Sequence, residues 1–185
     1  GVEPMALLSL MARLGSSKPV ELVSSMDDLV AGFNIGSFGA APTKFDAEDL
    51  FPLTRHHVQA LPYAAVKDRI AALGVPEAEA EAFWAVAKGN ITILDDLGPW
   101  WTLFRDGAEP VVDEADRDFV RQALGLLPAQ PWTTATWGEW TQAVKDATGR
   151  KGKDLFRPLR RALTGRDAGP EMADVMPLLR KVPVV

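Results

Sequence analysis

A stretch near the C-terminal end, GRKGKDLFRPLRRALTG at residues 149–165, carries two patterns at once. With about 100° between successive residues of a helix, apolar side chains gather on one side of residues 153–163: Leu155, Phe156, Leu159, Ala162 and Leu163. Basic side chains gather on another side: Lys153, Arg157, Arg160 and Arg161. These patterns predict a helix that packs its apolar side on the protein and presents its basic side to an anion.

Pro158 interrupts this pattern in the middle of the stretch. A proline lacks a backbone N–H, and its ring clashes with the preceding helical turn. We therefore expect either that Pro158 lies in the first turn of a shorter helix or that it kinks a longer one.

The charge of the chain is distributed unevenly. The formal net charge is -5, yet residues 150–181 hold nine basic and four acidic residues, which leaves the rest of the chain strongly acidic. One basic end on an acidic body favours a local anion-binding surface. A solvated charged face is the alternative that charge alone leaves open.

Outside this stretch, apolar spacing and the positions of Gly, Pro and capping residues predict helices almost throughout. The expected helices cover residues 5–14, a short segment capped by Ser25, 46–61, 62–74, 76–88, 91–97, 113–127, 136–149 with a Thr136–Glu139 capping box, and a last one from Gly169. The fold class is therefore all-α, a helical bundle array of two packed subdomains. We expect a first helical region at residues 1–75, followed by two helical subdomains at residues 76–130 and 131–185.

Several classes of function lose support from composition. Cysteine is absent, which removes disulfides, thiolate nucleophiles and cysteine-based zinc sites and fits a reducing cytoplasm. No apolar run approaches the roughly 20 residues that span a bilayer, and the first residues lack the basic start of a signal peptide. Adjacent His56 and His57 point in different directions on a helix, so we expect neither a catalytic centre nor a metal site.

Six tryptophans offer a different interpretation: Trp84, Trp100, Trp101, Trp132, Trp137 and Trp140. Aromatic residues at helical spacing usually lie in the core, and we expect each of them there. The alternative is a helical protein-interaction scaffold that uses this Trp-rich middle and does not bind RNA.

Several runs of the sequence resemble bacterial glutamyl-tRNA synthetases. Residues 149–165, then Gly169-Pro170 and residues 172–179, are similar to the C-terminal anticodon-binding region of that family, which typically shows Gly-x-Lys-Gly-x-x-Leu-Phe-x-Pro-Leu-Arg-x-Ala-Leu-Thr-Gly before a Gly-Pro and an apolar helix. Residues 1–15 resemble the segment just after the family's catalytic domain, and residues 44–58 resemble its stem-contact helices. The resemblance covers nearly the whole chain and implies the anticodon-binding fold of that class I family.

The resemblance also implies an activity for a longer parent protein, which would attach glutamate to tRNA with ATP and magnesium. The family's two ATP-site signatures are absent here, so we expect a fragment without the catalytic domain, inactive alone and without a cofactor of its own. The expected partner is tRNA(Glu), and tRNA(Gln) is a second possibility. We expect a monomer that does not contact membranes.

Individual residues follow from the same resemblance. The family's anticodon contacts carry over onto Arg160 and onto Gly169, Pro170 and Met172 in the next loop. The basic residue with which the family reads the last anticodon base falls near Lys88. Among the remaining cations, we expect phosphate or other tRNA contacts from Lys151, Lys153, Arg157 and Arg161.

Overall fold

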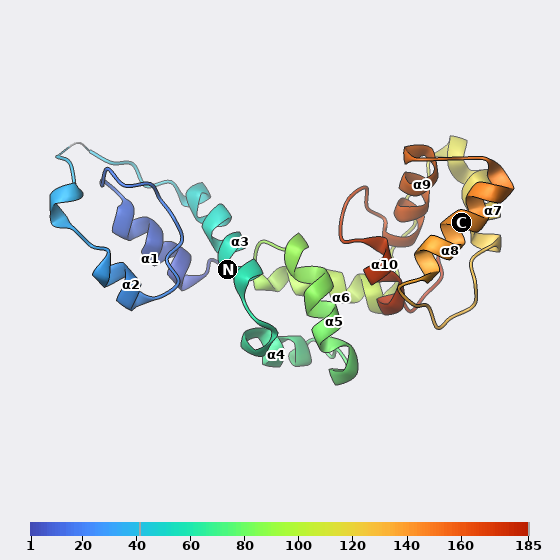
Figure 1. Ribbon diagram of the computed structural model, residues 1–185, viewed down its shortest axis with the longest axis horizontal. Coiled ribbons are helices and arrows are strands. Elements are labelled where there is room, and N and C mark those ends of the chain that lie inside the picture. The colour runs from blue at the N-terminus through green and yellow to red at the C-terminus, as the bar shows by residue number, and fades with distance from the viewer. Residues whose placement is uncertain (41, 185) are drawn as a thin grey trace. The chain divides into compact units, whose positions relative to one another are not determined.

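The computed structural model describes residues 1–40 and 42–184, and in that part of the chain the regular elements are helices joined by loops (Figure 1). Its α-helices are α1 (Pro4–Arg13), α2 (Met26–Ala31), α3 (Leu50–Ala60), α4 (Tyr63–Ala72), α5 (Glu77–Ala87), α6 (Leu97–Asp106), α7 (Arg117–Gly125), α8 (Thr136–Thr148), α9 (Lys153–Thr164) and α10 (Met172–Val175). The described residues contain no β-strand, only an isolated bridge between Ser16 and Phe38. The predicted all-α class is confirmed.

Short 3-10 turns join many of these helices: η1 (Ile35–Ser37), η2 (Ala47–Asp49), η3 (Lys88–Asn90), η4 (Leu94–Asp96), η5 (Glu114–Asp116) and η6 (Met176–Leu178). In the part of the chain that the structure describes, no helix has both the length and the apolar composition that a membrane span requires.

The chain forms two compact units, which are described separately. The first comprises residues 1–69 and 91–97, and the second comprises residues 70–90 and 98–185. The subdomain boundaries expected near residues 75 and 130 stay predictions.

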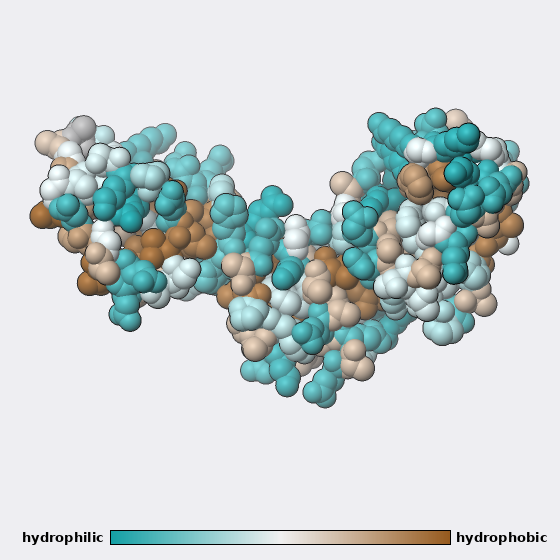
Figure 2. Space-filling view, in the orientation of Figure 1, coloured by the Kyte–Doolittle hydropathy of each residue, from teal (hydrophilic) through white to brown (hydrophobic). Residues whose placement is uncertain are grey.

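The first unit is built on the packing of α1 against α3. Ala6 and Leu10 of α1 meet Leu50 and Leu53 of α3 in a buried cluster. Ser25 caps α2 as predicted, because its Oγ accepts a hydrogen bond from the N–H of Asp28 at 3.2 Å. Exposed apolar side chains remain on α1 and α2: Leu7, Leu8, Met11, Met26 and Val30. Figure 2 shows a hydrophobic area on this part of the molecule. The first unit therefore presents an apolar surface as well as an apolar core.

The second unit has an aromatic core. The Phe83 ring packs edge-on against Trp101 and Phe104, with centroid distances of 5.6 and 5.9 Å. Trp140 is fully buried, and its Nε1 donates to the carbonyl of Ala123 at 2.8 Å. Five of the six tryptophans are at most 5 % exposed, which confirms their predicted core role, whereas Trp137 is half-buried. The Trp-rich segment accordingly offers little indole surface to a partner protein.

Two local predictions are wrong. Residues 91–97 do not form a helix of their own, because the Asp96 carboxylate accepts hydrogen bonds from the N–H groups of Thr92 and Ile93 and bends the chain just before α6. Helix α6 instead begins at Leu97 and includes Pro99 in its first turn, where no helical N–H donor is required. The capping box at Thr136 is also not formed, because Thr136 Oγ1 accepts from the N–H of Thr133 at 2.8 Å.

Candidate nucleic-acid interface

Helix α9 has the amphipathic character that its sequence predicts. Leu155, Leu159, Ala162 and Leu163 are at most 2 % exposed and hold the helix on the body of the second unit. Phe156 was expected among them, and that prediction is wrong: its side chain is 44 % exposed. A residue 100° beyond Leu155 lies at the edge of the buried side, so the apolar contact is narrower than the sequence suggests.

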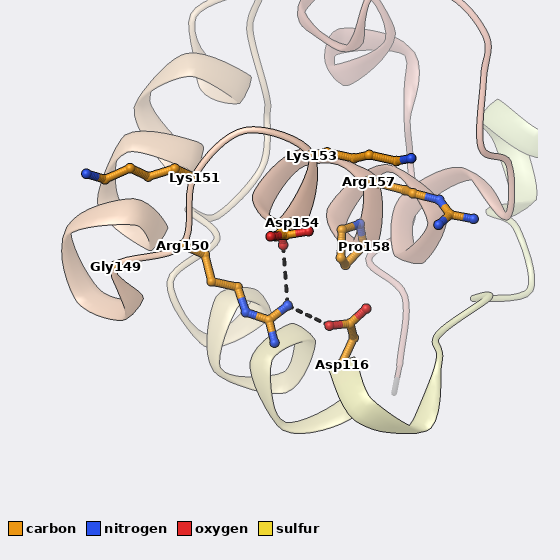
Figure 3. A pocket seen from close by; sticks show the side chains of 8 residues that line it. All are labelled: Asp116, Gly149, Arg150, Lys151, Lys153, Asp154, Arg157 and Pro158. Carbon is orange, nitrogen blue, oxygen red and sulfur yellow. Dashed lines mark hydrogen bonds and ion pairs between the residues drawn. The ribbon is translucent and has the colours of Figure 1, made fainter.

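The backbone at Pro158 is stabilised from outside the helix. Helix α9 continues through Pro158, which excludes the shorter helix. Pro158 has no N–H for the carbonyl of Asp154, four residues earlier. Arg150 Nη1 donates to that carbonyl at 3.3 Å, and it also pairs with Asp116 at 2.5 Å (Figure 3). The Arg150 guanidinium lies 3.9 Å from the centroid of the Phe119 ring. Arg150 therefore fastens the loop before α9 to α7.

Beside the contacts of Arg150 lies an open pocket of about 670 Å³, lined by four basic side chains and by the carboxylates Asp116 and Asp154. Besides Arg150, the basic side chains that line this pocket are Lys151, Lys153 and Arg157. Figure 3 shows the two lysine side chains extending in opposite directions, Lys151 from the loop and Lys153 from the start of α9. Both lysines are exposed, and neither lies within 4.0 Å of a described carboxylate. Both ammonium groups are thus free to meet anionic groups of a ligand.

The other basic side chains of α9 differ in their exposure and in their pairing with carboxylates of the protein. Arg157 Nε pairs with Asp167 at 2.6 Å, although both side chains remain about half exposed. Arg161 is only 14 % exposed and pairs with Asp113 at 2.6 Å. The structure therefore places Arg161 in an internal ion pair, and we do not carry it into the proposed interface.

Arg160 lies against the loop that follows α9. Its Nη2 donates to the carbonyl of Pro170 at 3.0 Å, and no described carboxylate lies within 4.0 Å of its guanidinium. Burial lowers the pKa of Arg160 from its ordinary value, although Glu171 acts in the opposite direction. Arginine nevertheless remains charged in proteins, so Arg160 is a half-buried cation with unused donors.

Gly169 allows this loop to approach so closely. Its φ is +158°, and a Cβ atom there would lie 3.2 Å from the Trp100 ring and 3.4 Å from Arg160 Nη1. Either contact is tighter than most real Cβ contacts, so a larger residue would push the loop away. The structure thus brings together Arg160, Gly169 and Pro170, as the sequence predicted.

Two of the predicted site residues are placed differently. Met172 is 2 % exposed and belongs to the core, so its side chain has no surface for a ligand in this conformation. Lys88 begins η3 and is half-buried, and it does not line either pocket beside α9. Neither side chain therefore lines the pockets beside α9.

Sequence reasoning missed three residues near α9. Arg166 is exposed and has its guanidinium carbon 4.3 Å from the centroid of the Trp100 ring, a cation–π contact across 66 positions that no local pattern could reveal. Asp167 was counted among the acids of the basic segment, but its pairing with Arg157 was not foreseen. Phe156 was assigned to the core.

Among the described residues, no group of three or more His, Asp or Glu side chains could hold a metal ion.

Comparisons with known proteins agree with this geometry. The chain belongs to the anticodon binding domain family, whose model matches residues 55–183. Among curated proteins, it is 70% identical over 182 residues to Glutamate--tRNA ligase 1 of Cereibacter sphaeroides and 64% identical over 182 residues to Glutamate--tRNA ligase 1 of Paracoccus denitrificans. Each alignment covers 98% of this chain and 41% of the relative, so the chain spans about two-fifths of the length of these relatives. The predicted resemblance to bacterial glutamyl-tRNA synthetases is confirmed.

Solved structures share the fold. A glutamate tRNA ligase from Elizabethkingia meningosepticum matches with a TM-score of 0.75 at 20% identity, over 96% of this chain and 38% of that chain. Glutamate-tRNA synthetase from Elizabethkingia anophelis matches with a TM-score of 0.76 at 20% identity, over 97% of this chain and 38% of that chain. At this identity the likeness concerns the fold alone.

Proposed function

We propose that this chain is the anticodon-binding part of a glutamate–tRNA ligase. In this proposal it binds the anticodon stem and loop of tRNA(Glu) and positions the tRNA, while glutamate is attached by a part of the full-length protein outside these residues. The family match and the names of the relatives support the proposal.

The observation that carries it is the set of cations around α9 without a carboxylate partner. Lys151 and Lys153 are exposed beside the first pocket, and Arg160 presents unused donors next to the Gly169-Pro170 loop. We assign phosphate contacts to the two lysines, because an ammonium group acts on phosphate as a point charge. Base contacts fall to Arg160, because its planar fork matches base edges. Phosphate contacts would set register, and base contacts would provide specificity.

ATP and magnesium belong in this proposal to the part of the full-length protein outside these residues. Within residues 1–40 and 42–184, no group of three or more His, Asp or Glu side chains could hold a metal ion. We therefore derive no catalytic step from this chain and expect it to be inactive alone. We further propose that the full-length protein is a monomer in the cytoplasm. Its substrate is tRNA(Glu), and tRNA(Gln) is a second candidate substrate.

Binding of tRNA(Glu) to the 185-residue chain tests the proposal directly. Fluorescence anisotropy with a labelled tRNA(Glu) transcript is expected to give binding that weakens with rising salt and with changes in the anticodon. A transcript with the same stem and an altered anticodon serves as the matched control. Equal affinity for both transcripts, or binding to neither, contradicts the proposed function. An aminoacylation assay on the chain alone is expected to give no charged tRNA.

A further inference from the structure

An exposed aromatic ring stands within the basic surface of α9. Phe156 is 44 % exposed, although its neighbours Leu155 and Leu159 are fully buried. The ring is supported from behind by Trp137, with 6.2 Å between the ring centroids and a tilt of 36°. Covering the exposed part of this ring with a flat ligand would remove apolar surface from water and is therefore favourable.

Phe156 also lines a second open pocket of about 470 Å³. This pocket is lined by Lys153, Phe156, Arg157, Arg160 and Asp167. Its walls therefore combine one aromatic ring, three cations and one carboxylate. Asp167 is held in place by Arg157, whose Nε lies 2.6 Å from the carboxylate oxygen. Arg160 is held by its bond to the carbonyl of Pro170.

These walls match an unpaired nucleobase better than they match a phosphate alone. A phosphate gains nothing from a phenyl ring, and the Asp167 carboxylate repels it. A base has a flat face that stacks on an aromatic ring, and its edge carries both donors and acceptors. Arg160 can donate to that edge, while Asp167 can accept from it. The cations also attract the phosphates on either side of the base.

We infer that Phe156 is the stacking wall of a pocket for one unpaired base of the bound RNA loop. The inference rests on the proposed function and adds to it a base-binding site on the outer side of α9. The base lies on the Phe156 ring, its edge meets Arg160 and Asp167, and Lys153 takes a neighbouring phosphate. Helix α9 then supplies two walls of the base pocket, the ring of Phe156 and, one turn later, the guanidinium of Arg160.

The test compares the 185-residue chain with its Phe156→Leu and Phe156→Tyr variants. The probe is a synthetic anticodon stem-loop of tRNA(Glu), used intact and with a single abasic nucleotide at each loop position in turn. Phe156→Leu is expected to weaken binding of the intact loop about 10-fold, because base–aromatic stacking is lost. Phe156→Tyr keeps a ring and is expected to bind like the parent chain. Phe33→Leu is the matched control, since Phe33 is 54 % exposed and also pairs with another ring, Phe38, in the first unit.

At one loop position, the loss of affinity caused by removing the base and the loss caused by Phe156→Leu are expected not to add. The abasic RNA weakens binding to the parent chain about 10-fold, and Phe156→Leu causes no further loss on that RNA. A 5-iodouridine at the same position is expected to cross-link to Phe156 of the unaltered chain, a result that does not depend on the folding of a variant. The inference is overturned if Phe156→Leu costs the same on every abasic RNA, if it costs nothing, or if no position cross-links to Phe156. The proposed function fails separately, when the parent chain does not discriminate the anticodon.

Discussion

Arg150 donates a hydrogen bond to the backbone carbonyl of Asp154, at 3.3 Å from Nη1 to oxygen. The same guanidinium pairs with Asp116 and covers the Phe119 ring, and both members of the ion pair are less than a third exposed. Arg150→Met is therefore expected to lower the free energy of unfolding by about 1–3 kcal/mol, because a partly buried carboxylate and a carbonyl lose their donor. Urea denaturation followed by circular dichroism measures this.

Pro158 explains why that carbonyl needs a donor from outside the helix. Pro158→Ala restores a backbone N–H to serve Asp154, so Arg150→Met is expected to cost about 0.5–1 kcal/mol less in the Pro158→Ala background. Arg121→Met provides the control, since Arg121 and its partner Asp118 are 59% and 99% exposed and such pairs contribute little. Equal losses for Arg150→Met in both backgrounds would show that Arg150 does not replace the missing donor.

The two free lysines should govern the salt dependence of RNA binding. Lys151→Gln and Lys153→Gln each remove one phosphate contact, so each is expected to reduce the slope of log affinity against log salt by about 1. Affinity for cognate and altered anticodons should fall by similar factors. Lys67→Gln, on the exposed surface of α4, should leave the slope unchanged. Anisotropy titrations at several salt concentrations measure these slopes, and an unchanged slope in both lysine variants contradicts the assignment.

Arg160 should instead affect specificity. Arg160→Ala is expected to cost about 1–3 kcal/mol of binding to the cognate tRNA and to reduce the difference between cognate and altered anticodons. Arg160→Lys keeps the charge but cannot both hold the carbonyl of Pro170 and present a planar fork, so it should recover little of the discrimination. Titrations of both variants with the two transcripts check this. A full recovery by lysine would indicate a phosphate contact in place of a base contact.

The pKa of Asp167 determines how this residue contributes to the stability of the fold at acid pH. The hydrogen bond from Arg157 holds the pKa of Asp167 below its usual range, and the charge of Arg157 acts in the same direction while desolvation opposes it. A carboxylate with a lowered folded-state pKa stabilises the fold above its unfolded-state pKa, and this stabilisation is lost as the pH falls through the lowered pKa. Thermal denaturation below about pH 4 should therefore show a smaller acid-induced loss in Asp167→Asn than in the parent chain. Equal acid-induced losses would exclude this role.

Local signals explain why much of the fold could be predicted from the sequence. Gly149 and Gly165 end α8 and α9 with φ values of 73° and 67°, as glycines after a helix commonly do. Apolar spacing also identified the side of α9 that is buried. At residues 91–97 and at Thr136, by contrast, a side chain that bonds to the backbone replaces the predicted helix and the predicted capping box. Such competition depends on local geometry that periodicity does not encode.

The candidate site was predictable only where it is local. Arg160 and the Gly169-Pro170 loop lie within ten residues of each other, and a helix followed by a glycine turn brings them together. The nearer of the two carboxylate partners of Arg161, by contrast, is Asp113, 48 positions earlier. Whether an arginine faces a ligand or an internal carboxylate depends on tertiary packing, so the engaged and free cations of α9 look alike in the sequence. Met172 illustrates the same limit, because it follows a predicted contact loop yet packs in the core.

The half-buried position of Trp137 gives the chain an intrinsic optical reporter. The other five indoles are shielded from water, but Trp100 contacts the Gly169 loop and Arg166. Trp137 alone among the six is partly exposed, and its ring packs against the Phe156 ring. A change in tryptophan fluorescence on adding a ligand would therefore originate mainly from Trp137 and Trp100, on the two sides of the candidate site, and it could be followed in real time without a label.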